Sequence, residues 1–309
     1  MTEQAFAKPV PNAEHPLLLS DGATIVLRRH GQIGRPRLVL SHGNGLAIDG
    51  YVAFWSLLCA RFEVIVFDMR NHGANPTHSL VNHHFDRFAE DLHEIWSAID
   101  QVFGRAPTVG LFHSMSAVAA AIQLKTFGAA CDGLVLFDPP VYPPAGHRLE
   151  ALELADMNDL ARRARRRPEQ YDSPDQLAEQ FARRKAFSQW VPGSARALAY
   201  ASLRRTADGT LYELACPREY EAKIYETNDH PDPWTVLTSN LALPVLVIGG
   251  DPELPGQGPP ALLCAAMAQL GGFDYHAIAG TSHFLQIEQP QVCVDTLLSF
   301  IQQRIPGFA

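Results

Sequence analysis

Short apolar runs that alternate with helical stretches constrain the fold of this chain more than any other feature. Four of the runs are RLVLSHG (37–43), FEVIVFD (62–68), PTVGLF (107–112) and GLVLFD (133–138). Helical patterns separate them, most clearly over residues 84–103, where apolar side chains recur every three or four positions. Strands that alternate with helices form a parallel sheet with helices on both faces. The sequence therefore predicts an α/β fold with a mostly parallel sheet.

Further strands are predicted at both ends of this series. HPLLLS (15–20) and ATIVLRRH (23–30) form an opening pair around an Asp21-Gly22 turn. Towards the C-terminus the alternation consists of strands LPVLVIGG (243–250) and FDYHAIAG (273–280) and of helices over 259–270 and 290–304. These elements extend the same sheet.

One long segment interrupts the alternation, from Tyr142 to Leu243, where the chain is charged and helical. We therefore expect an α/β core made of residues 1–141 and 244–309, and a helical insertion of residues 142–243. The basic run Arg162–Arg167 within the insertion is interpreted as a solvated helix face, because the insertion also carries many acidic residues.

Composition excludes several classes of protein. The 309 residues are 47% hydrophobic and 19% charged, which is typical of a globular protein with a sizeable core. A net charge of −8 argues against a nucleic-acid partner. The polar opening residues predict neither a signal peptide nor a membrane anchor, and no apolar run approaches the roughly 18 residues that span a bilayer. Five scattered cysteines without a Cys-x-x-Cys pair favour a cytoplasmic location.

Four motifs each follow a predicted strand, at the edge of a parallel sheet where ligand sites form. They are Ser41-His42-Gly43-Asn44-Gly45, Asp68-Met69-Arg70-Asn71-His72-Gly73, the turn around Ser114, and Ala279-Gly280-Thr281-Ser282-His283-Phe284. Their order and spacing resemble the α/β-hydrolase family, in the branch with a helical cap between strands six and seven. The resemblance covers nearly the whole chain. It implies the α/β-hydrolase fold, with residues 142–243 as the cap, and chemistry similar to that of serine esterases.

Ser114 is the predicted nucleophile. A serine hydroxyl needs a base to take its proton, and in this family it stands on a tight turn between a strand and a helix. The usual Gly-x-Ser-x-Gly pattern has Phe112 and Ser116 in place of its glycines. Ser116 is small enough for such a turn. We expect Phe112, with His113, to lie at the substrate pocket, where Phe112 narrows the pocket or marks a relaxed, less active turn.

The predicted base is His283, which follows the last strand and a Gly-Thr-Ser loop. A carboxylate should hold the other ring nitrogen of this histidine. The family places that acid after strand seven, where the register favours Glu253 and, with a shorter loop, Asp251. Asp138, after strand six, is the third alternative.

Two backbone N–H groups should stabilise the oxyanion, that of Met115 directly after the nucleophile and that of Asn44 in the loop after the third strand. The Asn44 side chain also resembles a halide-binding asparagine of haloalkane dehalogenases. Those enzymes use an aspartate nucleophile, so Ser114 disfavours dehalogenation.

No metal or cofactor is expected. His78, His83, His84 and His93 have no recognisable ligand spacing and are predicted to be loop or surface residues. We expect the loop Asp68–Gly73 to have a structural role and no catalytic one.

The predicted activity is hydrolysis of a carboxylic ester, a thioester or a related acyl bond of a small molecule, without a nucleic-acid or membrane partner. Four aromatic residues of the insertion either line an acyl pocket or form the core of the cap: Phe187, Trp190, Tyr200 and Tyr212. Three alternatives remain open. The same fold could catalyse acyl transfer, C–C bond hydrolysis or a lyase reaction. It could also be a scaffold that binds a ligand without catalysis, which Phe112 would favour, or the insertion could serve oligomerisation.

Overall fold

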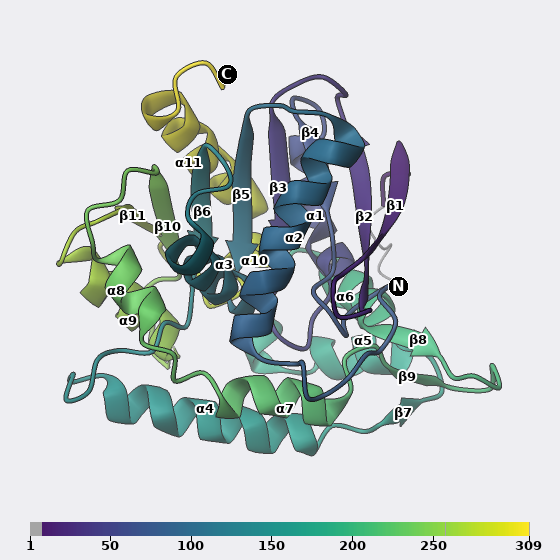
Figure 1. Ribbon diagram of the computed structural model, residues 1–309. Coiled ribbons are helices and arrows are strands. Elements are labelled where there is room, and N and C mark those ends of the chain that lie inside the picture. Colours follow the sequence, from purple (N-terminus) through teal and green to yellow (C-terminus); the bar gives the residue numbers. More distant parts are fainter. Residues whose placement is uncertain (1–7, 257, 309) are drawn as a thin grey trace.

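A computed structural model describes residues 8–256 and 258–308 and contains an eight-stranded sheet (Figure 1). The strand order is β1-β2-β4-β3-β5-β6-β10-β11. β2 is antiparallel to both of its neighbours, and the other pairs are parallel. This confirms the predicted α/β fold with a mostly parallel sheet. The strands are β1 (Ala13–Leu18), β2 (Thr24–Gly31), β3 (Arg37–Ser41), β4 (Glu63–Val66), β5 (Thr108–His113), β6 (Gly133–Phe137), β10 (Val245–Gly249) and β11 (Asp274–Ala277).

Helices pack on both faces of the sheet, so its central strands are buried on both sides. Successive residues of β4 illustrate this, because Ile65 belongs to one hydrophobic cluster and Val64 and Val66 to the other. One cluster includes α2 (Phe85–Phe103), α3 (Met115–Phe127), α8 (Asp232–Leu237) and α9 (Pro259–Ala268). The other includes α1 (Val52–Leu58), α10 (Leu285–Glu288) and α11 (Pro290–Arg304). Burial on both faces is why these strands appear in the sequence as continuous apolar runs.

Residues 142–243 contain helices as expected, together with a small sheet that the sequence did not predict. The helices besides α8 are α4 (Glu150–Arg165), α5 (Pro174–Ala182), α6 (Ser194–Ser202) and α7 (Arg218–Glu226). The antiparallel sheet has the order β7-β9-β8, from β7 (Gln170–Tyr171), β8 (Leu203–Arg205) and β9 (Tyr212–Leu214). α4 and α7 pack along each other below the main sheet in Figure 1.

Local sequence signals set the bounds of the inserted helices. Pro168 follows α4 closely, and proline disfavours a helical conformation in the residue before it. Ser173 caps α5, since its side chain accepts a hydrogen bond from the Gln176 N–H, and Pro174 occupies the first helical position.

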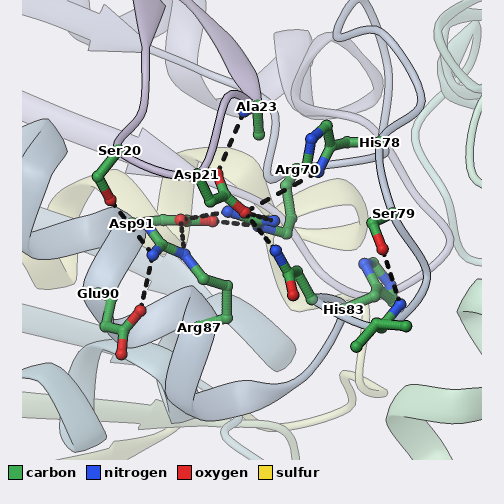
Figure 2. A network of polar contacts seen from close by, with 12 residues as sticks. Ser20, Asp21, Ala23, Arg70, His78, Ser79, His83, Arg87, Glu90 and Asp91 are labelled. Carbon is green, nitrogen blue, oxygen red and sulfur yellow. Dashed lines mark hydrogen bonds and ion pairs between the residues drawn. The ribbon is translucent and has the colours of Figure 1, made fainter.

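A polar network fixes the loop Asp68–Gly73 in place. Arg70 donates to Asp91 of α2 at 2.5 and 2.6 Å and to Asp21 of the β1–β2 turn at 2.9 Å. Arg87, one helical turn before Asp91, binds the same carboxylate, as Figure 2 shows. Arg70 and Asp91 are each 1% exposed, so the two charges neutralise one another inside the protein. The loop is thereby tied to both the turn and the helix.

His78, His83, His84 and His93 do not form a metal site. Within the described ranges 8–256 and 258–308, no group of three or more His, Cys, Asp and Glu side chains is arranged to hold a metal ion. His83 is in a loop but buried, and its ring stacks on His72. His84 caps α2 by accepting a hydrogen bond from the Arg87 N–H. In the same ranges, no helix has the length and apolar character needed to cross a membrane.

Candidate active site

Ser114 stands on a sharp turn between β5, which ends at His113, and α3, which begins at Met115. Its φ of 54° is a conformation that non-glycine residues rarely adopt. The Ser114 N–H donates to the Phe137 carbonyl of the neighbouring strand at 3.0 Å, and this bond helps to hold the turn. Strained residues of this kind concentrate at functional sites, because the surrounding structure has to maintain them.

Ser116 shows how the turn forms without its usual second glycine. The Ser116 side chain is fully buried, and its Oγ accepts from the His113 N–H and donates to the His113 carbonyl, both at 3.0 Å. The hydroxyl therefore ties the first turn of α3 to the end of β5.

The prediction that Phe112 lies at the substrate pocket is wrong. Its ring is fully buried in the core, edge-on to Phe67 and Trp96. A side chain on Gly110, two residues earlier on the same face of β5, would approach the Phe112 ring to 2.7 Å. Gly110 therefore leaves the space that Phe112 fills.

His113 does not line the cavity above Ser114 either; it lies beneath the site and links two of its parts. Its Nδ1 is 2.7 Å from the Tyr51 hydroxyl, which accepts from the Gly43 N–H at 3.3 Å. Its Nε2 is 2.9 Å from the His283 carbonyl oxygen. Burial, with the neighbouring His283, holds the pKa of His113 well below its usual value, so the ring is neutral. A neutral ring that donates from Nε2 and accepts at Nδ1 satisfies both contacts.

We expect Tyr51→Phe to lower kcat by about 10-fold and to leave KM nearly unchanged, because loss of the hydroxyl loosens the loop at Gly43 and the backbone at His283 without altering the cavity wall. Steady-state turnover kinetics together with a thermal melt measure this effect. The matched control is Tyr200→Phe, since Tyr200 is 46% exposed and its hydroxyl contacts Arg196 and Asp175. Equal kcat values for both variants would show that the link has no positioning role.

His283 connects Ser114 to a buried carboxylate. Its Nε2 is 3.0 Å from Ser114 Oγ, and its Nδ1 is 2.7 Å from Asp138 Oδ2. Asp138 is 1% exposed, and its Oδ1 accepts from the Gly250 N–H at 3.0 Å. This second bond orients the carboxylate towards the histidine.

The order of preference for the acid, which favoured Glu253 and Asp251, is therefore wrong for this structure. Asp251 accepts hydrogen bonds from the Glu253 N–H at 2.9 Å and the Gly280 N–H at 2.7 Å, and the Glu253 side chain is exposed. Neither carboxylate bonds to His283. The physical reason is the strand order, since β6 pairs directly with β5 and so brings Asp138 beside the Ser114 turn.

Asn44, predicted as an oxyanion donor, lies in the loop after β3, and Met115, the other predicted donor, begins α3 directly after Ser114. Their backbone N–H groups have no hydrogen-bond partner within the described parts of the chain, whereas Gly43 N and Gly45 N donate to Tyr51 Oη and His72 Nε2. A side chain on Gly43 would come within 3.1 Å of Ser114 Cβ, so this loop approaches the serine closely. The Asn44 side chain donates to the Glu221 carbonyl oxygen at 2.8 Å and so faces α7.

A cavity of about 500 Å³ opens above these residues and is lined by Ser114, His283 and Asn44. The inserted segment supplies most of the opposite wall, and the large apolar lining residues include Leu46, Leu160, Leu177, Phe181, Phe187 and Phe284. Of the four aromatic residues considered, Phe187 lines the cavity and stacks on the buried Trp190, with ring centroids 4.2 Å apart. Tyr200 and Tyr212 lie outside this lining. The volume suits a small organic ligand.

Comparisons with known proteins concern the family and the fold. A family model described as the alpha/beta hydrolase family matches residues 38–296. Comparison with curated proteins gives no match. Among solved structures, E-2-(acetamidomethylene)succinate hydrolase has a TM-score of 0.75 at 16% identity and covers 94% of this chain and 99% of its own. A thermophilic esterase from Thermogutta terrifontis has a TM-score of 0.65 at 21% identity, covering 94% and 98%. An esterase from Rhodococcus sp. ECU1013 has a TM-score of 0.65 at 19% identity, covering 94% and 99%. At such identities, the likeness shows the fold alone.

Proposed function

The chain belongs to the alpha/beta hydrolase family, and on this premise we propose that it hydrolyses a carboxylic ester or a related acyl bond with Ser114 as nucleophile. One observation carries the proposal. An unbroken chain of hydrogen-bond contacts runs from Ser114 Oγ through His283 to Asp138. Ser114 and His283 line a cavity that is large enough for a small substrate. This arrangement matches the roles of nucleophile, base and orienting acid.

In the first step, Ser114 Oγ attacks the acyl carbonyl carbon while His283 Nε2 takes the hydroxyl proton. Asp138 holds the other ring nitrogen in its protonated form and stabilises the positive charge that develops on the ring. The carbonyl oxygen becomes an oxyanion and accepts hydrogen bonds from the Asn44 and Met115 N–H groups. These two donors are supported by their lack of other partners in the described ranges.

In the second step, the tetrahedral intermediate expels the alcohol or thiol, which takes its proton from His283. The acyl group stays on Ser114 as an ester. A water molecule, activated by His283, then attacks that ester and releases the acid, and the proton returns to Ser114. The same three side chains therefore serve both halves of the reaction.

The alternative of a scaffold that binds a ligand without catalysis loses its main support. That alternative depended on Phe112 disabling the turn, and the ring of Phe112 is packed in the core instead. Ser114 keeps its strained backbone and its contact with His283.

Covalent labelling tests the proposal most directly. A fluorophosphonate should modify the wild-type protein at one site, which mass spectrometry should locate on the peptide containing Ser114, because only an activated serine reacts fast. The same preparation should hydrolyse p-nitrophenyl acetate, butyrate or octanoate, and the preferred chain length would indicate the depth of the cavity. Absence of both labelling and turnover would contradict the proposal.

A further inference from the structure

Four arginine side chains line the cavity above Ser114. Arg163 lies in the last turn of α4, Arg166 and Arg167 follow this helix, and Arg184 follows α5. One wall of the cavity is therefore basic, although the chain as a whole carries a net charge of −8.

The interpretation of the basic run as a solvated helix face applies to only part of it. Arg162 is exposed and pairs with Asp159, and Arg165 pairs with Glu219 and Glu226 of α7. These two side chains do not line the cavity. The other three arginines of the run line the cavity, but Arg163 and Arg166 are also exposed to solvent, so only Arg167, which is partly buried and paired with Glu221, departs from the interpretation.

Of the four arginine charges, only that of Arg167 is neutralised by an acidic side chain of the cavity lining. Glu221 is the one acidic side chain among the lining residues of the described structure, and it pairs with Arg167. The backbone carbonyl of Glu221 also accepts the hydrogen bond from the Asn44 side chain, so the ion pair is adjacent to the predicted oxyanion loop. Arg167 is thus already committed to a partner in the protein.

The remaining three arginines are poorly neutralised. Arg163 Nη1 is 3.6 Å from Asp159, a carboxylate that also binds Arg162. Arg166 and Arg184 have no acidic partner within residues 8–256 and 258–308. The Arg184 guanidinium lies 5.8 Å from the centroid of the Phe187 ring, which leaves its N–H groups available to a ligand.

The positive charges act on one another. Partial burial and the charges of Arg167 and Arg163 lower the pKa of Arg184. A bound anion would relieve this repulsion, and guanidinium groups bind carboxylates and phosphates through paired hydrogen bonds.

We propose that the substrate carries, besides its acyl bond, a carboxylate or a phosphate group, and that Arg166 and Arg184, assisted by Arg163, hold this group. The inference rests on the proposed function of Ser114. In this arrangement the acyl carbonyl lies at Ser114, the chain of the substrate contacts the apolar wall at Phe187 and Phe284, and the anionic end faces the arginines. The arginines select the substrate and fix its orientation; they take no part in bond breaking.

The experiment compares three ethyl esters of similar length: monoethyl adipate with a terminal carboxylate, ethyl 5-phosphonopentanoate with a terminal phosphonate, and uncharged ethyl heptanoate. Ethanol release by the wild-type protein should give a kcat/KM for the better anionic ester that is about 10- to 10²-fold above that for ethyl heptanoate, since hydrogen bonds to charged groups are stronger than neutral ones. The preference should shrink as ionic strength rises from about 0.01 M to about 1 M, where the screening length falls from about 30 to about 3 Å.

The double variant Arg166→Gln/Arg184→Gln should lose most of this preference, measured as the ratio of kcat/KM for the anionic ester to that for ethyl heptanoate. The matched control is Arg162→Gln on the outer face of α4, which should retain the preference. Whichever of the carboxylate and the phosphonate is preferred identifies the anion. Equal kcat/KM values for the three esters, unchanged in the double variant, would overturn the inference and leave the proposed function intact.

Calorimetric binding of the three esters to Ser114→Ala separates the two proposals, because it needs no hydrolysis. The inference is supported if an anionic ester binds more tightly than the neutral one and if this difference is lost when Arg166 and Arg184 are also replaced. This result would stand even if the wild-type protein hydrolysed none of the esters and the proposed function failed. Absence of any difference in binding between the anionic and neutral esters would overturn the inference.

Discussion

Replacement of Ser114 by alanine should lower kcat/KM for p-nitrophenyl butyrate by about 10⁴- to 10⁶-fold, which corresponds to about 5 to 8 kcal/mol of transition-state stabilisation. Alanine removes only the attacking oxygen. The backbone at this position has a φ of 54° with either residue, so the substitution adds no new strain to the turn. The oxyanion donors and the cavity stay in place, and we expect a small residual rate from them.

The control for this variant is Ser202→Ala. The Ser202 hydroxyl is buried on α6, has no hydrogen-bond partner in the described structure and does not line the cavity. This variant should retain the wild-type rate and fluorophosphonate labelling, while Ser114→Ala should lose both. Turnover by Ser114→Ala at more than about a tenth of the wild-type rate would rule out nucleophilic attack by this serine.

The sheet was predictable because its central strands are buried on both faces. β3, β4, β5 and β6 are each wholly buried, and such strands appear as uninterrupted apolar runs that local sequence reveals. The small sheet β7-β9-β8 was not predictable in this way. Its strands have only two or three residues, too few to show an alternating pattern.

The positions of Ser114 and His283 follow from local sequence, because Ser114 comes directly after β5 and His283 lies in the loop after β11. The acid does not, since its identity depends on which strands are neighbours in space. Position along the chain favours a carboxylate near Glu253, whereas the pairing of β5 with β6 places Asp138 beside His283.

The roles of Phe112 and of the arginines also could not be predicted from local sequence alone. The bulk of Phe112 suggests a crowded pocket until Gly110 is recognised as the residue that makes room for it on the core side of β5. Within the basic run at the end of α4, Arg163, Arg166 and Arg167 line the cavity whereas Arg162 and Arg165 do not, and this division depends on how the inserted segment packs above Ser114.

Asp138→Asn should lower kcat by about 10⁴-fold and leave the fold intact. Asparagine is isosteric with aspartate, tolerates the positive φ of 43° at this position, and its carbonyl oxygen can still accept from the Gly250 N–H. Its amide group would then face His283 Nδ1 as a donor. The histidine would have to carry its proton on Nε2, and in that tautomer it cannot take the proton of Ser114.

Two matched substitutions discriminate among the three carboxylates. Glu253→Gln should have almost no effect, because the Glu253 side chain is exposed and has no contact with His283. Asp251→Asn should cost less than about 10-fold, since one of its two backbone hydrogen bonds, to Glu253 N–H or Gly280 N–H, can be retained by the amide oxygen. Measurement of kcat for the three variants decides the assignment. If Glu253→Gln gave the largest loss, the acid would follow strand β10, as the position along the chain suggests, and the hydrogen bond between Asp138 and His283 would have only a structural role.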